Sequence, residues 1–401
     1  MFRSEVTTDG PRVASPDHER RWETALRTPF RIVFLPLRLV ANGLEVGIGH
    51  FGPRYLDPKP HRPEPLSPTL ALSVVVGDGT TLGIGPAITW VGFPTMDSRL
   101  RATGSWSLPD HRHARFSEAI GTRHPVSVAL RADYDYKPNR SYYGIGNASS
   151  EADLSYFRLE TMSAEAALLL GRSRLRQVRI VGGYSNMTPL SAYNGSPPLE
   201  AVFATADVPY DDRATQEFLY GVTADFAALD DNRHPSRGVH ARVDLKRASG
   251  VRSSDPNYNQ WNLEGRAYVP VFAKRRVLAF RGIYAGIGPL GSATTTIPFY
   301  RLIRSDGVTN FAGYAPNRFR DRQLLLGRVE YRWMIVHEMS AIALFELGAV
   351  ASRSDAFTLR DAHRSVGGGL RLGRSELAAV RLEIAKSDEG LRVALDLGST
   401  F

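Results

Sequence analysis

The last twelve residues, Gly390 to Phe401, read GLRVALDLGSTF and alternate in polarity. On an extended strand, one side would carry an apolar row: Leu391, Val393, Leu395 and Leu397. The other side would carry Arg392 and Asp396. Side chains of a strand point alternately to opposite faces, whereas a strand inside a globular core needs two dry faces. The stretch therefore fits the wall of a transmembrane β-barrel, with one lipid-facing row and one water-facing row.

The same alternation recurs along the chain, and repetition distinguishes a barrel from one amphipathic strand. Four further stretches show it: 126–136, 239–246, 328–333 and 380–384. The competing interpretation is a soluble antiparallel sandwich whose polar faces are solvated. The barrel is favoured because the polar rows carry both signs of charge. The apolar rows also add Tyr and Trp near strand ends, as the aromatic girdles of membrane barrels do.

Composition narrows the classes of function. The 401 residues are 43% hydrophobic, yet no apolar run reaches the roughly 18 residues of a transmembrane helix. The absence of cysteine removes disulfide scaffolds, thiolate metal sites and cysteine nucleophiles. The net charge is +9, but the arginines alternate along strands and form no patch. A charged lumen and anionic lipids therefore explain them better than nucleic acid does.

Four regions are predicted along the chain. Residues 1–27 are polar and lack the apolar segment of a secretory signal, so we interpret the sequence as a mature or recombinant chain. Residues 28–51 predict a short amphipathic helix with Thr28 as its N-cap. This helix would lie at the periplasmic side of the membrane or in the barrel mouth; the alternative is a helix docked on a soluble core. Residues 52–68 form a Pro-rich linker, and residues 69–401 form the barrel.

The fold class is all-β, a transmembrane antiparallel barrel of 16 strands, an even number as in single-chain bacterial barrels. The predicted strands cover residues 69–77, 80–93, 98–109, 112–121, 124–137, 153–171, 174–187, 216–227, 238–250, 258–272, 275–288, 321–335, 338–351, 363–374, 376–387 and 390–401. With both termini in the periplasm, the long connections fall on the outer side of the membrane: 138–152, 188–215, 289–320 and 352–362. The connections on the other side are tight turns, as is typical of these barrels.

Several motifs follow one another in the register of this strand count. The connection at 289–320 carries Phe311-Ala312-Gly313-Tyr314 and leads into Arg318-Phe319-Arg320-Asp321-Arg322, and the thirteenth strand carries Leu344-Phe345-Glu346-Leu347-Gly348. Three other stretches carry further motifs of this kind: Tyr142 to Asn147, Asp231 to Gly238, and Glu330 to Arg332. With these motifs, the chain resembles, over residues 70 to 401, the BamA/TamA superfamily of outer-membrane assembly and secretion barrels, also called the bacterial surface antigen family.

The resemblance implies that the long connection folds back into the lumen and that an arginine at its tip pairs with an aspartate of the thirteenth strand. Here Ala312 stands at the arginine position and Glu346 at the aspartate position. We expect Arg318 or Arg320 to pair with Glu346 instead, and the alternative is that these charges are separately solvated in a wet lumen. Family members usually carry periplasmic POTRA modules. Residues 1–68 lack that pattern, which predicts a short member without them.

The resemblance also implies a lateral seam between the first and the last strand, where a client strand would pair with an open edge. Gly390 and Gly398 would weaken this seam, because glycine packs little and costs conformational entropy. The alternative is that both glycines only allow strand curvature. Phe401 is a terminal aromatic residue of the kind that barrel-insertion machinery recognises.

Candidate catalytic and metal-binding residues are few. His111 and His113 have no third ligand nearby in the sequence. His240 and Asp244 would share the inner face of a strand, but no nucleophile accompanies them. Residues 367–369 are three glycines in a strand, where close packing or a bend accounts for them better than ligand binding. We therefore predict no catalytic residue, no metal site and no cofactor.

The leading hypothesis is a non-enzymatic barrel, multi-pass in the bacterial outer membrane with its N-terminal segment in the periplasm, that assists the insertion or translocation of proteins or lipids. The predicted partners are outer-membrane lipids together with unfolded outer-membrane protein clients or periplasmic partner proteins. A homo-oligomer is compatible with the sequence, and nucleic acid is not expected. The alternative is a passive pore or a structural, lipid-organising barrel without assembly activity.

Overall fold

The structure is a computed structural model that describes most of the chain from residue 68 onward. The described ranges are 68–76, 82–108, 110–173, 175–192, 195–210, 212–232, 235–271, 276–291, 296–305, 311–336, 339–372 and 380–397. The predicted helix at 28–51, the polar segment before it and nearly all of the Pro-rich linker lie outside the described residues. Those predictions therefore stay predictions.

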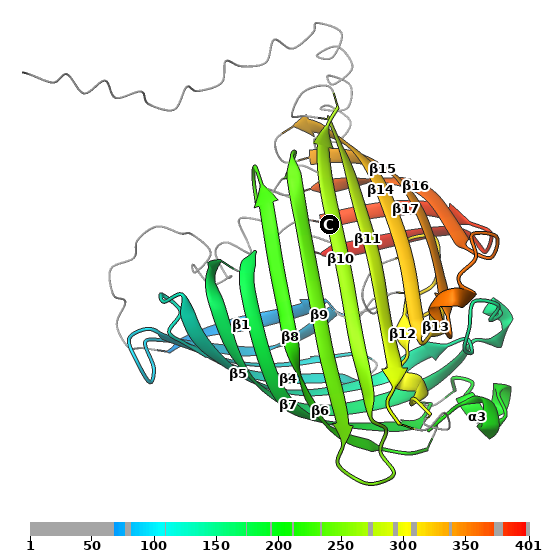
Figure 1. The fold of residues 1–401 in the computed structure, drawn as a ribbon, viewed down its shortest axis with the longest axis horizontal. Helices are drawn as coiled ribbons and strands as arrows, with labels where there is room; N and C mark the ends of the chain where they lie inside the picture. The colour runs from blue at the N-terminus through cyan, green and yellow to red at the C-terminus, as the bar shows by residue number, and fades with distance from the viewer. Residues whose placement is uncertain are drawn as a thin grey trace, which may run out of the picture.

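A single antiparallel sheet of 16 strands forms the wall of the molecule (Figure 1). Its strands are β1 (Thr69–Val76), β2 (Leu82–Val91), β3 (Ser98–Ser107), β4 (His111–Ile120), β5 (Val126–Tyr142), β6 (Ser155–Ser173), β7 (Arg176–Ser191), β8 (Thr215–Leu229), β9 (Gly238–Gly250), β10 (Tyr258–Pro270), β11 (Arg276–Pro289), β14 (Gln323–Val336), β15 (Met339–Ala351), β16 (His363–Leu372), β17 (Val380–Ser387) and β18 (Gly390–Leu397). Each strand pairs with the next one in this order. The prediction of an all-β fold with sixteen wall strands is confirmed.

The inner face of the wall carries buried charged side chains, and the outer face carries exposed apolar side chains. This is the reverse of a soluble protein, whose core is apolar and whose surface is polar. Glu330 and Glu346 are completely buried on the inner face, whereas Phe345 is 46% exposed and Leu391 is 69% exposed on the outer face. Exposed apolar area on this scale is stable in hydrocarbon, and charges are tolerated when they face the interior and pair with one another. The alternation that predicted the strands therefore sets which side faces lipid.

The connection between β11 and β14 folds back against the inner wall. It contains η4 (Phe299–Arg301) and a two-stranded sheet of β12 (Ile303–Arg304) and β13 (Arg320–Asp321), as Figure 1 shows inside the curved wall. We call residues 296–305 and 311–322 the lumen loop. Its apolar side chains join inward-facing wall residues in one buried cluster: Ala248, Tyr258, Ile283, Ala285, Ile287, Ile297, Leu302, Ile303, Phe311, Tyr314, Phe319, Leu324, Leu326 and Val350.

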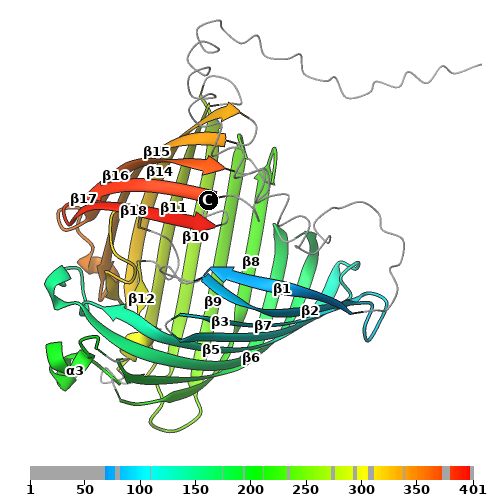
Figure 2. The ribbon, with the colours of Figure 1, turned by 180° about the vertical axis from the view of Figure 1, so that it is seen from behind.

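The sheet has two free edges in the described residues. Figure 2 views the molecule from the side on which edge strands β1 and β18 both lie. The strand order begins at β1 and ends at β18, and no hydrogen-bonded pairing joins these two strands within the described ranges. The remaining elements are short and lie in connections: η2 (Glu151–Asp153), α3 (Leu199–Val202), η3 (Thr205–Asp207) and η5 (Ser354–Ala356). Within the part of the chain that the structure describes, no helix has the length and apolar character needed to cross a membrane.

Candidate functional site

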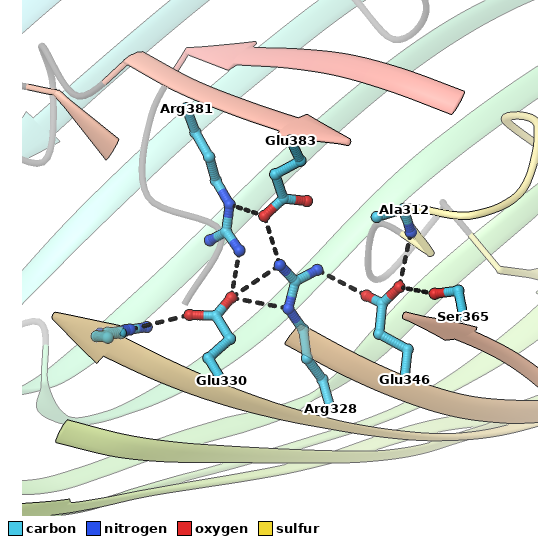
Figure 3. A network of polar contacts seen from close by, with 8 residues as sticks. Ala312, Arg328, Glu330, Glu346, Ser365, Arg381 and Glu383 are labelled. Carbon is cyan, nitrogen blue, oxygen red and sulfur yellow. Dashed lines mark hydrogen bonds and ion pairs between the residues drawn. The ribbon is translucent and has the colours of Figure 1, made fainter. Parts of the chain in front are cut away.

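A buried group of charges on the inner wall joins β14, β15 and β17 (Figure 3). Arg328 lies at its centre and donates to Glu330 at 2.8 Å, to Glu346 at 2.6 Å and to Glu383 at 2.6 Å. Two further arginines bind the same carboxylates, and we call the full set the charge cluster: Arg328, Glu330, Arg332, Glu346, Arg381 and Glu383. These six side chains carry three positive and three negative charges. This balance offsets the cost of taking them out of water.

The backbone explains why strands as far apart as β14 and β17 meet here. Arg328 and Glu346 are directly opposite in the β14–β15 pairing, which brings their side chains within reach. The intervening strand β16 presents Gly367 and Gly369 to the same face, because they are paired with inward-facing residues of β17. A Cβ added at these two glycines would lie only 2.4 and 2.2 Å from backbone oxygens of β17. Because these two glycines have no side chains, the inner face of β16 leaves room for Arg328 to reach Glu383 on β17.

The tip of the lumen loop, residues 311–314, docks directly on this cluster. The Ala312 N–H donates to Glu346 Oε2 at 2.9 Å, and the Ser365 hydroxyl donates to the same oxygen at 2.7 Å. Gly313 packs so tightly that an added Cβ would lie 2.4 Å from Ser365 Cβ. Its carbonyl oxygen accepts a hydrogen bond from Ser387 Oγ at 2.7 Å. The tip is thus held by backbone groups and by close fit.

The two aromatic residues of the tip pack against each other and against neighbouring rings. The ring centroids of Phe311 and Tyr314 are 4.6 Å apart, and the Tyr314 ring lies 5.0 Å from that of Phe319. His363 of β16 stacks on Phe319 at 3.9 Å. Such contacts add to the burial of apolar area, so this part of the loop has a fixed position on the wall.

The expected pairing of Glu346 with Arg318 or Arg320 is wrong. Glu346 binds Arg328 of the neighbouring strand, and Arg318 binds Glu389 at 2.6 Å instead. A residue directly across an antiparallel pair is always close, whereas a loop residue must be brought there by folding. The wall therefore supplies the cation that the tip lacks at Ala312, and the tip contributes a backbone N–H to the same carboxylate.

Arg320 has a different environment, in a pocket of aromatic rings. It is 1% exposed, and its guanidinium carbon lies 5.0 Å from the ring centroid of Tyr142 and 5.7 Å from those of Phe157 and Phe299. Its Nη1 donates to the carbonyl oxygen of Phe299 at 3.2 Å. Cation–π contacts of this kind gain strength when water is excluded. The neighbouring Asp321 accepts from the Arg322 N–H at 2.7 Å, and burial raises the pKa of Asp321 above its usual range.

The glycines that the sequence singled out have distinct positions. Gly348 faces the loop side of β15, and an added Cβ would lie 3.3 Å from the Leu325 oxygen. Gly390 begins β18 with a φ of +123°, a backbone conformation that favours glycine, and open space surrounds its Cβ position. Gly390 is the first residue of the strand after the two-residue turn, where it pairs with Ser387. Gly398 and Phe401, the other two residues assigned to the seam, lie outside the described residues.

A second charged anchor fixes the beginning of the lumen loop. Arg301 of η4 forms an ion pair with Glu217 of β8, whose other oxygen accepts from the Tyr258 hydroxyl at 2.6 Å. Arg301 Nη2 also donates to Ser185 Oγ at 3.2 Å. The loop is therefore bound to two separate parts of the wall, at β7–β10 by this anchor and at β14–β17 by its tip.

Sequence reasoning missed the partners that hold the loop. It placed Arg328, Arg381 and Glu383 on polar strand faces but gave them no role in the site, and it did not identify Arg301 or Glu217. A signal was present in the polar rows, because three successive inward residues of β14 are all charged. Charged side chains this close together on an inner face need partners of opposite charge on the neighbouring elements.

The motif at 142–147 also belongs to the loop contacts. The Gly146 N–H donates to the Arg320 carbonyl oxygen at 2.7 Å, and Asn147 Oδ1 accepts from the Val350 N–H at 3.0 Å. His363 Nε2 lies 2.9 Å from the Asn147 carbonyl oxygen. The motif thus ties the connection after β5 to β13, β15 and β16.

Histidine and aspartate side chains lie close to one another elsewhere on the inner face. His111 and His113 both face Asp135, at 2.9 and 3.4 Å, and His240 faces Asp225 at 3.3 Å. In the described part of the chain, no group of three His, Cys, Asp or Glu side chains has an arrangement that would hold a metal ion. These side chains line the lumen as close His–Asp contacts.

Comparison with known proteins identifies the family. A model of the Omp85 superfamily domain matches residues 100–401. The chain belongs to the Omp85 superfamily. Members of this superfamily are non-enzymatic assembly and transport barrels that reside in the bacterial outer membrane, and its homologues interact with outer-membrane protein clients and lipids. No curated protein matches the sequence.

Three solved structures are similar to this chain to different degrees, and the BamA structure shares the fold. BamA from Haemophilus ducreyi lacking POTRA domains 1–3 is similar with a TM-score of 0.62 at 16% identity, over 84% of this chain and 71% of that chain. CdiB from Acinetobacter baumannii matches with a TM-score of 0.48 at 11% identity, over 83% of this chain and 60% of that one. CdiB from Escherichia coli gives 0.49 at 11% identity, over 84% and 63%. This chain spans less than two thirds of either CdiB chain.

Proposed function

We propose that this Omp85 barrel assists the insertion or translocation of other proteins, or of lipids, at the outer membrane. The observation that carries the proposal is the open sheet: β1 and β18 each have one strand neighbour in the described residues. An edge strand presents a row of unpaired N–H and C=O groups, which is a template for an incoming strand. A client strand would add to this edge by backbone hydrogen bonds.

The docked lumen loop supports the same proposal. A wall that opens at one seam loses the closure that normally stabilises a barrel, so its remaining strands need other support. The tip on the charge cluster and the Arg301–Glu217 pair supply that support from inside. The loop would hold the shape of the wall while the edges exchange partners.

The test is reconstitution of the full chain into liposomes, followed by addition of an unfolded outer-membrane β-barrel as client. We expect the client to fold faster than in protein-free liposomes of the same lipid. Equal folding rates in both would contradict the proposal. A lipid-scrambling assay with fluorescent headgroups in the same vesicles separates protein clients from lipid clients.

A passive pore is the second candidate, and the inner wall of β4–β9 favours it. There the charged pairs remain partly exposed, as in Arg115 with Asp133 at 2.5 Å and Arg242 with Asp225 at 3.3 Å. A polar, hydrated wall is typical of ion-conducting barrels. Steady conductance that is insensitive to deleting residues 300–320, without any effect on client folding, would favour the pore.

A further inference from the structure

The hairpin turn that leads into the last strand is bonded to the lumen loop at three points. Ser387 Oγ donates to the Gly313 carbonyl oxygen at 2.7 Å, and the Tyr314 hydroxyl donates to Asp388 Oδ1. Arg318 Nε donates to Glu389 Oε1 at 2.6 Å. The side chain of Arg318 is 3% exposed and that of Glu389 is 13% exposed, so their ion pair is largely shielded from water.

Arg318 connects this turn to a third segment. Its Nη1 donates to Ser149 Oγ at 2.8 Å and its Nη2 donates to the Ser149 carbonyl oxygen at 2.6 Å. The guanidinium also lies over the ring of Phe319, with its carbon 4.7 Å from the centroid. Since Arg318 is buried and is also held by Ser149 and by the ring of Phe319, it is a fixed point to which the turn is attached.

The position of β18 depends on this attachment more than the position of an inner strand would. It is an edge strand, and in the described residues its strand pairing is with β17 alone, over eight residue pairs from Ser387–Gly390 to Val380–Leu397. Edge elements with few partners open first in local unfolding. The turn has only two residues before Gly390, so a force on Asp388 or Glu389 acts directly on the start of β18.

We propose that the lumen loop is a latch on the last strand. While Tyr314 and Arg318 hold the turn at residues 388–389, the β17–β18 hairpin keeps one position. When these contacts are released, the turn and β18 change their position relative to the wall, while β17 stays bound to β14 through the charge cluster. The inference that β18 moves rests on these contacts alone. The inference that this movement admits a client strand rests on the proposed function.

Pulsed electron paramagnetic resonance on the full chain in liposomes tests the latch. The chain has no cysteine, so Val393→Cys on β18 and Val128→Cys on β5, both outward and exposed, would be the only labelled positions. The latch variants are Glu389→Gln and Tyr314→Phe, alone and combined. The control is Asp355→Asn, which removes a carboxylate from an exposed ion pair with Arg353 near the same end of the barrel.

We expect the distance distribution to widen and its maximum to shift in the double latch variant, and to match the parent in the control. If the double variant fails to fold, Tyr314→Phe decides alone, because it keeps the packed ring and removes only the hydroxyl, which reaches Asp388 and the Arg364 carbonyl oxygen. A distribution identical to the parent in the folded latch variants would overturn the latch.

A client-folding assay on the same samples separates this inference from the function on which its last step rests. Movement of β18 in the latch variants without client folding in any sample would support the latch and contradict the assembly function. Client folding in the parent together with an unmoved β18 in the latch variants would do the reverse.

Discussion

Gly313 occupies a position where the loop tip and the wall have no room for a side chain. An added Cβ would lie 2.4 Å from Ser365 Cβ and 3.1 Å from Ser387 Cβ. We therefore expect Gly313→Ala to weaken docking of the tip by about 1–3 kcal/mol, the usual cost of overpacking. Protection of the amides of residues 311–322 from hydrogen exchange should fall by roughly 5–150-fold. Gly265→Ala is the matched control, because nothing lies within 4 Å of its Cβ position, and equal losses in both variants would contradict the tight fit.

Glu346 is the residue at which the wall and the loop tip share one carboxylate. Glu346→Gln removes one negative charge from a cluster of three positive and three negative side chains and loses the pairing with Arg328. Removing one partner from a buried ion pair typically costs about 3–5 kcal/mol, and Arg328 keeps two other carboxylates, so we expect the lower end. The loosened tip should raise the ion conductance of single reconstituted barrels.

A matched substitution on the hydrated side of the lumen separates this effect from a simple change of lumen charge. Glu165 pairs with Arg179 on the inner face of β6 and is about a third exposed. Glu165→Gln should leave the loop docked and change the current little. A conductance increase of the same size in both variants would show that charge, and not the docked tip, sets the current.

At the scale of elements, the sixteen wall strands follow from the sequence because their period is visible in it. Burial of one face and lipid on the other force strict alternation, as in β9 and β17. The alternation fails where the loop packs: Leu324 and Leu326 are buried inside while Leu325 is 47% exposed outside. A strand with two apolar faces is a sign that an apolar element covers the inner one.

The partner of Glu346 was not predictable in the same way. Strand pairing brings Arg328 opposite it, but the pairing register has to be known first, and a shift by one residue would turn the side chain outward. The contact from β14 to Glu383 further needs Gly367 and Gly369 to leave the inner face of β16 bare. Periodicity predicts such faces, whereas contacts between strands that are not neighbours depend on how the whole sheet curves.

The β17–β18 turn should respond to pH through Glu389. Burial raises the pKa of Glu389 above its usual range despite the nearby Arg318, with Glu151 and Asp388 adding to the rise. The hydrogen bond from Tyr314 is the main cause that lowers the pKa of Asp388, and the electrostatic effect of His363 adds to this lowering. As pH falls, Glu389 therefore takes a proton first, at a pH above the ordinary value of about 4.3, and Asp388 takes one only at lower pH.

The two shifts have opposite signs for stability. A raised carboxyl pKa means that folding favours the protonated form, so protonation of Glu389 does not lower the global stability, although it removes the ion pair with Arg318. The stability contributed by Asp388 is lost as pH falls through its lowered pKa. We expect a mobile spin label on β18 below the Glu389 transition while the barrel stays folded. Glu389→Gln should remove that pH dependence, and its persistence in this variant would assign it to another titratable group.

At the scale of the whole molecule, the unpaired edges of the described sheet, β1 and β18, predict that function requires these two edges to move relative to each other. Leu70 of β1 and Val393 of β18 are both exposed on the outer face, 77% and 66%, and belong to the two edges. Cysteines at these two positions, joined by a flexible bismaleimide, would tether the edges in a chain that has no other cysteine. The tethered barrel should stay folded, because no existing pairing is broken, and should lose its acceleration of client folding.

The same chemistry at a closed part of the wall provides the control. Val128 and Leu168 are directly opposite in the β5–β6 pairing and both are exposed on the outer face. Hydrogen bonds already hold these strands together, so a tether between them restricts nothing that moves. Client folding should be lost with the tether across the seam and kept with the tether across β5 and β6. Full activity with the seam tethered would place the working surface elsewhere on the barrel, because an edge that cannot separate from its neighbour has no room for an incoming strand.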